Sequence, residues 1–91
     1  MVKTTSPKQS DYQIHPDAPL FVIGIVSVMT HVPIWTLRRL DEMGVVSPKR
    51  INKKVRCYSH SQVNTIVYIQ HLMEERKVNI SGIKVILEMK K

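Results

Sequence analysis

Short stretches of apolar residues at helical spacing recur along the chain, and polar or charged stretches separate them. Residues 1–19 are polar, contain three prolines and lack a sustained apolar repeat, so we expect a flexible tail there. Residues 20–23 are a short apolar run that fits a strand. A first helix is predicted near residues 24–30, because apolar residues then recur at helical spacing at Ile25, Val28, Met29 and Val32.

A second short helix is predicted over residues 34–43. Pro33 suits the first turn of a helix, and Gly44 suits a left-handed position directly after its end. Ile34 and Leu37 supply an inward face, whereas Trp35 lies roughly 100° around the helix from Ile34 and is predicted to be exposed. Two short helices joined by three or four residues predict a helix-turn-helix.

Residues 45–58 are too charged and too punctuated for a core helix, and they predict a two-stranded ribbon with a basic tip. Ser59 and Gln62 then form the pattern of a capping box. A long amphipathic helix should follow to about Arg76, with apolar positions at Val63, Ile66, Val67, Ile69, Leu72 and Met73. Asn79 is placed to cap a last helix that runs into Lys90. This order predicts a mainly α, winged helix-turn-helix domain over residues 20–91.

The composition adds a strong positive charge. Fourteen Lys and Arg residues oppose seven Asp and Glu residues, which favours a polyanionic partner, nucleic acid before anionic membrane. Cys57 is the only cysteine, so no intrachain disulfide or cysteine metal cluster can form, and a reducing cytoplasm is the expected setting. No apolar run approaches the roughly 18 residues of a membrane span, so we expect no membrane partner.

The inventory of reactive residues argues against an enzyme. The acidic residues lie in the tail or on charged helix faces, and the three glycines form no phosphate-binding loop. Cys57 and His60 are the one pair that resembles a thiol and its base, but a partly buried structural cysteine is much the commoner explanation. We therefore expect no catalytic site, no metal and no cofactor.

Two cationic surfaces instead suggest binding to double-stranded DNA. The second helix of a helix-turn-helix enters the major groove, so its candidate residues are Trp35, Thr36, Arg38 and Arg39. The alternative for Arg38 and Arg39 is a solvated face paired with Asp41 and Glu42. The wing favours the DNA interpretation, because it adds a second set of candidates for phosphate contacts at Lys49, Arg50, Lys53, Lys54, Arg56 and Tyr58.

The stretches FVIGIVSVMTHVPIWTLRRLDEMGVVSPKR, RCYS and VNISGIKVILE together resemble the DNA-binding domain of the MerR family of transcription regulators, over residues 20–89. Their details are similar to the heat-shock repressor and glutamine-synthetase repressor branches. The resemblance implies a dimer on operator DNA, with the second helix in the major groove and the wing along the backbone. By position, Thr36 and Arg38 match the family's Thr-Leu-Arg, and Arg56 and Tyr58 match its phosphate grip. Gly44 and Pro48 match the family's structural glycine and proline positions, and Leu37 and Ile83 match core positions.

The departures from the family pattern fall in the second helix. Many members have Arg-Tyr-Tyr where this chain has Arg38, Arg39 and Leu40, and related repressors often carry Arg or Gln where it has Trp35. The operator sequence therefore does not transfer. The sequence also ends about where the family's dimerisation helix and effector domain begin. If this is the whole protein, we expect a signal to arrive through a protein co-regulator, through the tail, or not at all.

Three functions remain open at this point. The first is a sequence-specific transcription regulator, with repression the expected outcome and the nucleoid the expected location. The second is an architectural DNA protein of the excisionase type, which shares the wing and also lacks an effector domain. The third is a protein interaction module whose basic face binds an acidic partner, and it predicts no DNA binding even at low salt.

Overall fold

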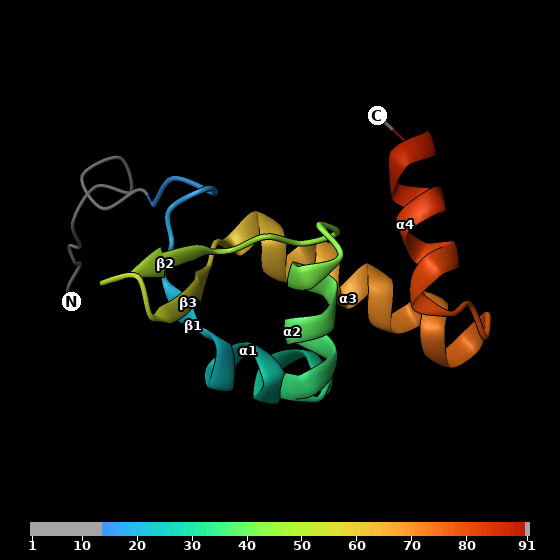
Figure 1. Ribbon diagram of the computed structural model, residues 1–91, viewed down its shortest axis with the longest axis horizontal. Coiled ribbons are helices and arrows are strands. Elements are labelled where there is room, and N and C mark those ends of the chain that lie inside the picture. The colour runs from blue at the N-terminus through green and yellow to red at the C-terminus, as the bar shows by residue number, and fades with distance from the viewer. Residues whose placement is uncertain (1–13, 91) are drawn as a thin grey trace, which may run out of the picture.

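The computed structural model describes residues 14–90, and it consists of four helices and a small antiparallel sheet (Figure 1). The elements in chain order are β1 (Phe21–Val22), α1 (Ile23–Thr30), α2 (Ile34–Glu42), β2 (Lys49–Ile51), β3 (Val55–Tyr58), α3 (His60–Glu75) and α4 (Ile80–Met89). The sheet lies at one end of the molecule and α4 at the other, with α3 running between them (Figure 1). The predicted winged helix-turn-helix is confirmed.

The ends of the helices follow the local signals in the sequence. Ser59 Oγ accepts a hydrogen bond from N of Gln62 at 3.1 Å, and Gln62 Oε1 accepts one from N of Ser59 at 3.0 Å. Asn79 Oδ1 accepts a hydrogen bond from N of Gly82 at 2.8 Å. Each bond satisfies an N–H group that has no partner within the helix. Gly44 has a φ of +74°, so the glycine predicted to end α2 is confirmed.

The sheet has one strand more than the predicted ribbon. β3 is the central strand and pairs with β2 on one side and β1 on the other. The short strand predicted near residues 20–23 is therefore the third member of the wing sheet. At the tip, Asn52 and Lys53 both have positive φ, and N of Lys54 donates to O of Ile51 at 3.1 Å. Positive φ at both central residues is typical of the tight turns whose twist matches a two-stranded ribbon.

The core gathers buried side chains from α1, α2, β3, α3 and α4, among them Val26, Leu37, Leu40, Ile66 and Ile83. Leu37 and Ile83 lie in the core as expected. The face predicted for the first helix is largely wrong, because Val26 and Thr30 are buried, whereas Ile25, Val28 and Met29 of the expected repeat are exposed. The fourth member of that repeat, Val32, is buried just after the helix. This helix is apolar around most of its circumference, so the period does not decide which side faces inward.

Two further core expectations are wrong. Val67 and Ile34 are exposed rather than inward-facing, although the residues next to them in the predicted stripes, Ile66 and Leu37, are fully buried. α3 is long, and the shorter elements packed against it leave part of its apolar circumference in solvent. Residues 1–13 of the predicted tail lie outside the described part of the chain. Residues 14–19 form a turn joined to the start of α3, where N of Ser61 donates to O of Pro16 at 3.0 Å.

Candidate nucleic-acid interface

The outward face of α2 is formed by the residues between its buried positions. Thr36, Leu37 and Leu40 are buried, which leaves Trp35 and Arg38 facing solvent. The predicted exposure of Trp35 is confirmed, because 70% of its surface is accessible. Thr36 was also a candidate for DNA contact, but only 1% of its surface is accessible and its side chain packs inside the helix-turn-helix. The matched family position thus supports the fold here and offers no free surface to a base.

The two arginines of α2 differ in their surroundings. Arg39 Nη1 lies 3.9 Å from Oε1 of Glu42, which is an exposed ion pair within one helix. Arg38 is exposed and makes no ion pair with any residue in the range 14–90. The alternative of a self-paired helix face therefore applies to Arg39 alone. Exposed pairs of this kind contribute at most about 1 kcal/mol, so Arg39 is free to exchange its partner.

The wing presents a row of exposed cationic side chains. Lys49 and Arg50 lie on β2, and Lys53 and Lys54 lie in the tip turn, where every residue is exposed. β2 is an edge strand of the sheet, so one side of its backbone has no neighbouring strand. The geometry leaves these ammonium and guanidinium groups accessible to phosphate oxygens.

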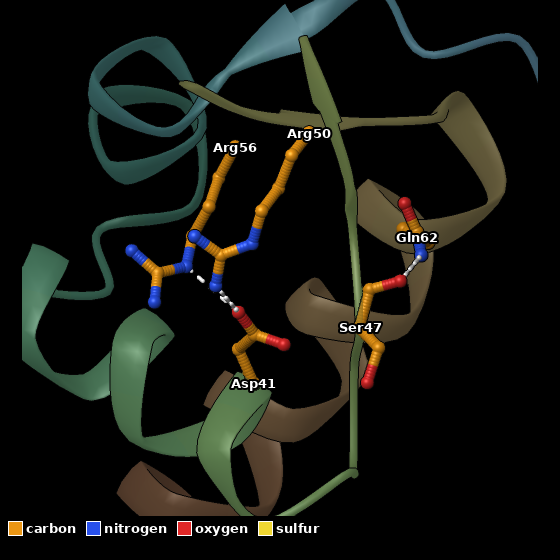
Figure 2. A network of polar contacts seen from close by, with 5 residues as sticks. All are labelled: Asp41, Ser47, Arg50, Arg56 and Gln62. Carbon is orange, nitrogen blue, oxygen red and sulfur yellow. Dashed lines mark hydrogen bonds and ion pairs between the residues drawn. The ribbon is translucent and has the colours of Figure 1, made fainter. Parts of the chain in front are cut away.

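An acidic residue joins the wing to α2. Arg56 Nε donates to Oδ2 of Asp41 at 2.7 Å, and Arg50 Nη2 donates to the same oxygen at 3.1 Å (Figure 2). Both bonds connect residues of the wing with the last turn of α2. From the sequence, Asp41 was expected to pair only with the neighbouring arginines Arg38 and Arg39. Because Arg50 and Arg56 lie nine and fifteen residues away, no helical or strand period indicates the pairing.

A second link holds the base of the wing. Gln62 Nε2 donates to the backbone oxygen of Ser47 at 3.0 Å (Figure 2). Gln62 therefore caps α3 through Oε1 and fixes the segment between α2 and β2 through Nε2. The wing is attached at two points, one on α2 and one on α3, so its position relative to α2 is determined by specific contacts.

Tyr58 is buried as well, contrary to the expectation from the sequence. It was expected to contact phosphate with Arg56, but none of its surface is accessible. Its hydroxyl group is buried and has no hydrogen-bond partner. Burial, with a smaller contribution from the Asp41 carboxylate, raises the pKa of Tyr58 to about 12 from the ordinary value of 10, against the opposing effect of Arg56 and Arg50. Alternation along the strand placed Tyr58 on the same face as Arg56, and that face is covered by the core at Tyr58.

The pair that resembled a thiol and its base is not brought together in one cavity. Cys57 is buried and lines an open cleft of about 220 Å³ together with Ser47, Lys49 and Gln62. His60 borders a different hollow, next to Leu20 and Phe21. Within residues 14–90, no group of three or more His, Cys, Asp or Glu residues could hold a metal ion. No helix in that range is long and apolar enough to cross a membrane.

Comparison with known proteins points to one family. Residues 21–90 match the family described as MerR HTH family regulatory protein. The heat shock protein HspR of Streptomyces coelicolor is 30% identical over 82 residues, which are 90% of this chain and 54% of the relative. The HTH-type transcriptional regulator GlnR of Bacillus anthracis, like that of Bacillus cereus, is 37% identical over 73 residues, which are 80% of this chain and 56% of the relative.

The chain thus spans about half the length of these curated relatives. The matched region of the family covers the helix-turn-helix, the wing and both C-terminal helices. This is the region in which the sequence resembled MerR regulators, and the resemblance is confirmed. The chain belongs to the MerR helix-turn-helix family of regulatory proteins.

Proposed function

We propose that this protein is a sequence-specific DNA-binding transcription regulator that acts as a repressor. α2 enters the major groove and reads bases, while the wing contacts the phosphate backbone. The observation that carries the proposal is the exposed face of Trp35 and Arg38 on a helix whose last turn is ion-paired to a cationic wing. A scaffold helix has no need of an exposed indole beside an unpaired guanidinium.

Each part of this surface has a distinct task in the proposal. Arg38 donates to base edges, for which the paired acceptors of guanine are the commonest partner of arginine. Arg39 leaves its weak ion pair with Glu42 for a phosphate or a base. Lys49, Lys53 and Lys54 neutralise phosphates along the adjoining backbone, and each such contact releases a condensed counterion. The wing thus supplies affinity and α2 supplies sequence preference.

The names of the relatives support the same function. GlnR is named as a transcriptional regulator of the helix-turn-helix type, and the family description names regulatory proteins. We infer that this chain acts on double-stranded DNA in the cytoplasm, in association with the nucleoid. The function requires no cofactor and no catalysis.

We further propose that the protein binds its operator as a homodimer. One helix-turn-helix reads only a half-site, and two copies supply the specificity that a genome demands. α4 favours a role in the contact, because among its residues only Ile83 is fully buried, while Val85 and Met89 are exposed. α4 also lies at the opposite end of the molecule from the wing, where it does not compete with DNA (Figure 1).

The test is selection of bound duplexes from random double-stranded DNA, followed by measurement of affinity for the selected and scrambled sequences over a range of salt concentrations. We expect one enriched sequence of two related half-sites, bound roughly 10³-fold or more tightly than scrambled DNA. The matched variants are Arg38→Ala and Arg76→Ala, which remove one positive charge from α2 and from the C-terminal end of α3. Arg38→Ala should lose preference for the selected sequence, and Arg76→Ala should not.

The outcomes separate the three functions. Failure to bind any duplex at low salt would favour a protein interaction module and would overturn the proposal. Binding without sequence preference, together with a large bend on circularly permuted probes, would favour an architectural protein. Selection of a defined sequence with little bending supports the regulator.

A further inference from the structure

The carboxylate of Asp41 is shared by two arginines at the junction of α2 and the wing. Both guanidinium groups donate to the same oxygen, Oδ2, at 2.7 Å from Arg56 and 3.1 Å from Arg50. The side chains of Asp41 and Arg56 are largely shielded, with accessible fractions of 14% and 17%, whereas Arg50 retains 44%. Shielding strengthens this pairing relative to an exposed ion pair, because less water screens the charges.

The way in which Arg56 donates leaves most of its hydrogen-bonding capacity unused. It binds Asp41 through Nε, and neither terminal nitrogen has a hydrogen-bond partner among residues 14–90. Figure 2 shows these two nitrogens directed away from the carboxylate. Arginine offers five N–H donors in a rigid planar fork that matches phosphate oxygens. Asp41 thus holds the guanidinium from one edge and leaves the other edge available.

We propose that Asp41 is a positioning residue for DNA binding, which orients Arg56 and Arg50 toward the phosphate backbone and fixes the wing relative to α2. The inference rests on the DNA-binding function proposed above. It assigns the acidic residue of the interface a favourable effect on binding to a polyanion, although its charge repels phosphate. The gain comes from order, because a long side chain already held in its bound orientation loses less freedom on binding.

Asp41 also lies beside two cationic side chains that face each other across the wing. The residue lies in the last turn of the helix proposed to read bases, and its partners lie on the two paired strands β2 and β3, where Arg50 is directly opposite Arg56. Two cations facing each other across an antiparallel pair repel one another. The register already places both side chains on one face of the ribbon, and the shared carboxylate offsets their repulsion there.

Asp41→Asn provides a test, because a positioning role and a purely electrostatic role predict opposite changes in affinity for DNA. Removal of one negative charge near DNA should raise affinity if Asp41 acts only through its field. If it positions the arginines, affinity should fall about tenfold despite the more favourable net charge. Glu42→Gln is the matched control, because it makes the same change of charge at the next residue, where the ion pair is long and exposed. It should leave affinity unchanged or raise it.

A double-mutant cycle with Arg56 separates positioning from general damage to the fold. On the Arg56→Ala background, Asp41→Asn should weaken binding much less than in the wild type, because only Arg50 remains for Asp41 to orient. Asp41→Glu should recover part of the loss. The salt slope of Asp41→Asn should fall by about one unit, since one ordered phosphate contact is lost. Thermal unfolding of each free variant shows that the compared proteins are folded.

If Asp41→Asn does not fold, Arg56→Lys replaces it in the test, because lysine keeps the charge but has neither the Nε donor nor the planar fork. It should bind DNA several-fold more weakly than the wild type. Equal or tighter binding by the folded test variant, with normal wild-type binding, would overturn the positioning role and leave the proposed function intact. Failure of the wild type itself to bind DNA would instead overturn the proposed function, and the DNA-binding role of Asp41 with it.

Discussion

Trp35 and Tyr58 are large aromatic residues that meet opposite surroundings in the same small domain. Trp35 lies outside the buried stripe of α2 and faces solvent, whereas Tyr58 lies at the end of the central strand and is enclosed by the core. Both were assigned to DNA on the basis of the sequence. Burial removes Tyr58 from the candidate interface, while Trp35 is the largest exposed apolar side chain of α2.

Trp35→Ala is expected to change recognition more than stability. An exposed indole contributes little to the core, so the melting temperature should stay within a few degrees of the wild type. Apolar contact with a thymine methyl group is a form of base readout, so preference for the selected operator should fall by about 1 to 3 kcal/mol. Thermal unfolding and binding to operator and scrambled duplexes measure the two effects. Strong destabilisation with specificity retained would show that Trp35 serves the fold.

Tyr58→Phe is expected to alter the alkaline limit of stability. In the unfolded chain tyrosine ionises near pH 10, whereas in the folded protein its pKa is raised to about 12, so the folded state holds its proton longer. The unfolded state then binds fewer protons between these values, and stability falls as the pH rises through them. The wild type should lose on the order of 1 kcal/mol more than Tyr58→Phe between pH 8 and pH 11.

Urea unfolding at the two pH values measures this difference. Lysines titrate in the same range but are common to both proteins, so the comparison isolates the phenol. At pH 8 the variant should be as stable as the wild type or slightly more stable, because the hydroxyl it removes is buried without a partner. Parallel pH profiles would mean that Tyr58 reaches solvent or a hydrogen-bond partner.

At the scale of elements, the junction between α2 and the wing distinguishes this domain from a plain helix-turn-helix. α2 brings the exposed indole and Arg38, and β2 and the tip turn bring the lysines. Asp41 connects the two elements, and Gln62 connects the base of the wing to α3. These contacts fix the position of the wing relative to α2 and α3.

Lys54→Ala tests the contribution of the wing tip. The tip residues are exposed and make no ion pair within residues 14–90, so the loss of one should not affect folding. Affinity for operator and random DNA should fall together, with a salt slope smaller by about 0.9. Arg76→Ala at the C-terminal end of α3 removes the same charge away from the wing and should leave the slope unchanged. A slope unaltered by Lys54→Ala would exclude the tip from the interface.

At the scale of the whole molecule, the sheet and α4 mark two opposite ends with different surfaces (Figure 1). The wing end is cationic, whereas α4 exposes Val85 and Met89. Isolated exposed apolar residues are ordinary on a protein surface, but two on one short, lightly packed helix suit a contact between copies. This division would keep the proposed DNA contact and the proposed contact between copies on separate parts of the chain.

The proposed homodimer predicts the number of chains that bind one operator. We expect two chains per saturated operator by sedimentation, whatever the state of the free protein. Val85→Glu combined with Met89→Glu should weaken operator binding at least tenfold and produce half-site complexes, because carboxylates would face each other in the contact. Val67→Glu, on exposed α3 surface, is the control and should bind normally. One wild-type chain per saturated operator would contradict the dimer.

The sequence by itself determined the features that depend on nearby residues. The capping box of Ser59 and Gln62, the cap at Asn79 and the left-handed Gly44 each involve groups within a few positions of one another. Such signals act before the chain has folded, so the helix boundaries and the order of elements could be predicted. The exposure of Trp35 was predicted in the same way, from its angle to an inward face of Ile34 and Leu37, although of those two residues only Leu37 is buried.

Only the tertiary structure decided which apolar and charged groups meet. α1 and α3 are apolar on more sides than they bury, so the packing of neighbours, and not the period, exposed Val28 and Val67. β1 joined the sheet because β3 had a free edge, and Tyr58 was enclosed where that strand reaches the core. Asp41 forms its ion pairs with two arginines of the wing and not with the neighbouring arginines of α2. These outcomes depend on distances between segments far apart in the sequence, which no local pattern of residues encodes.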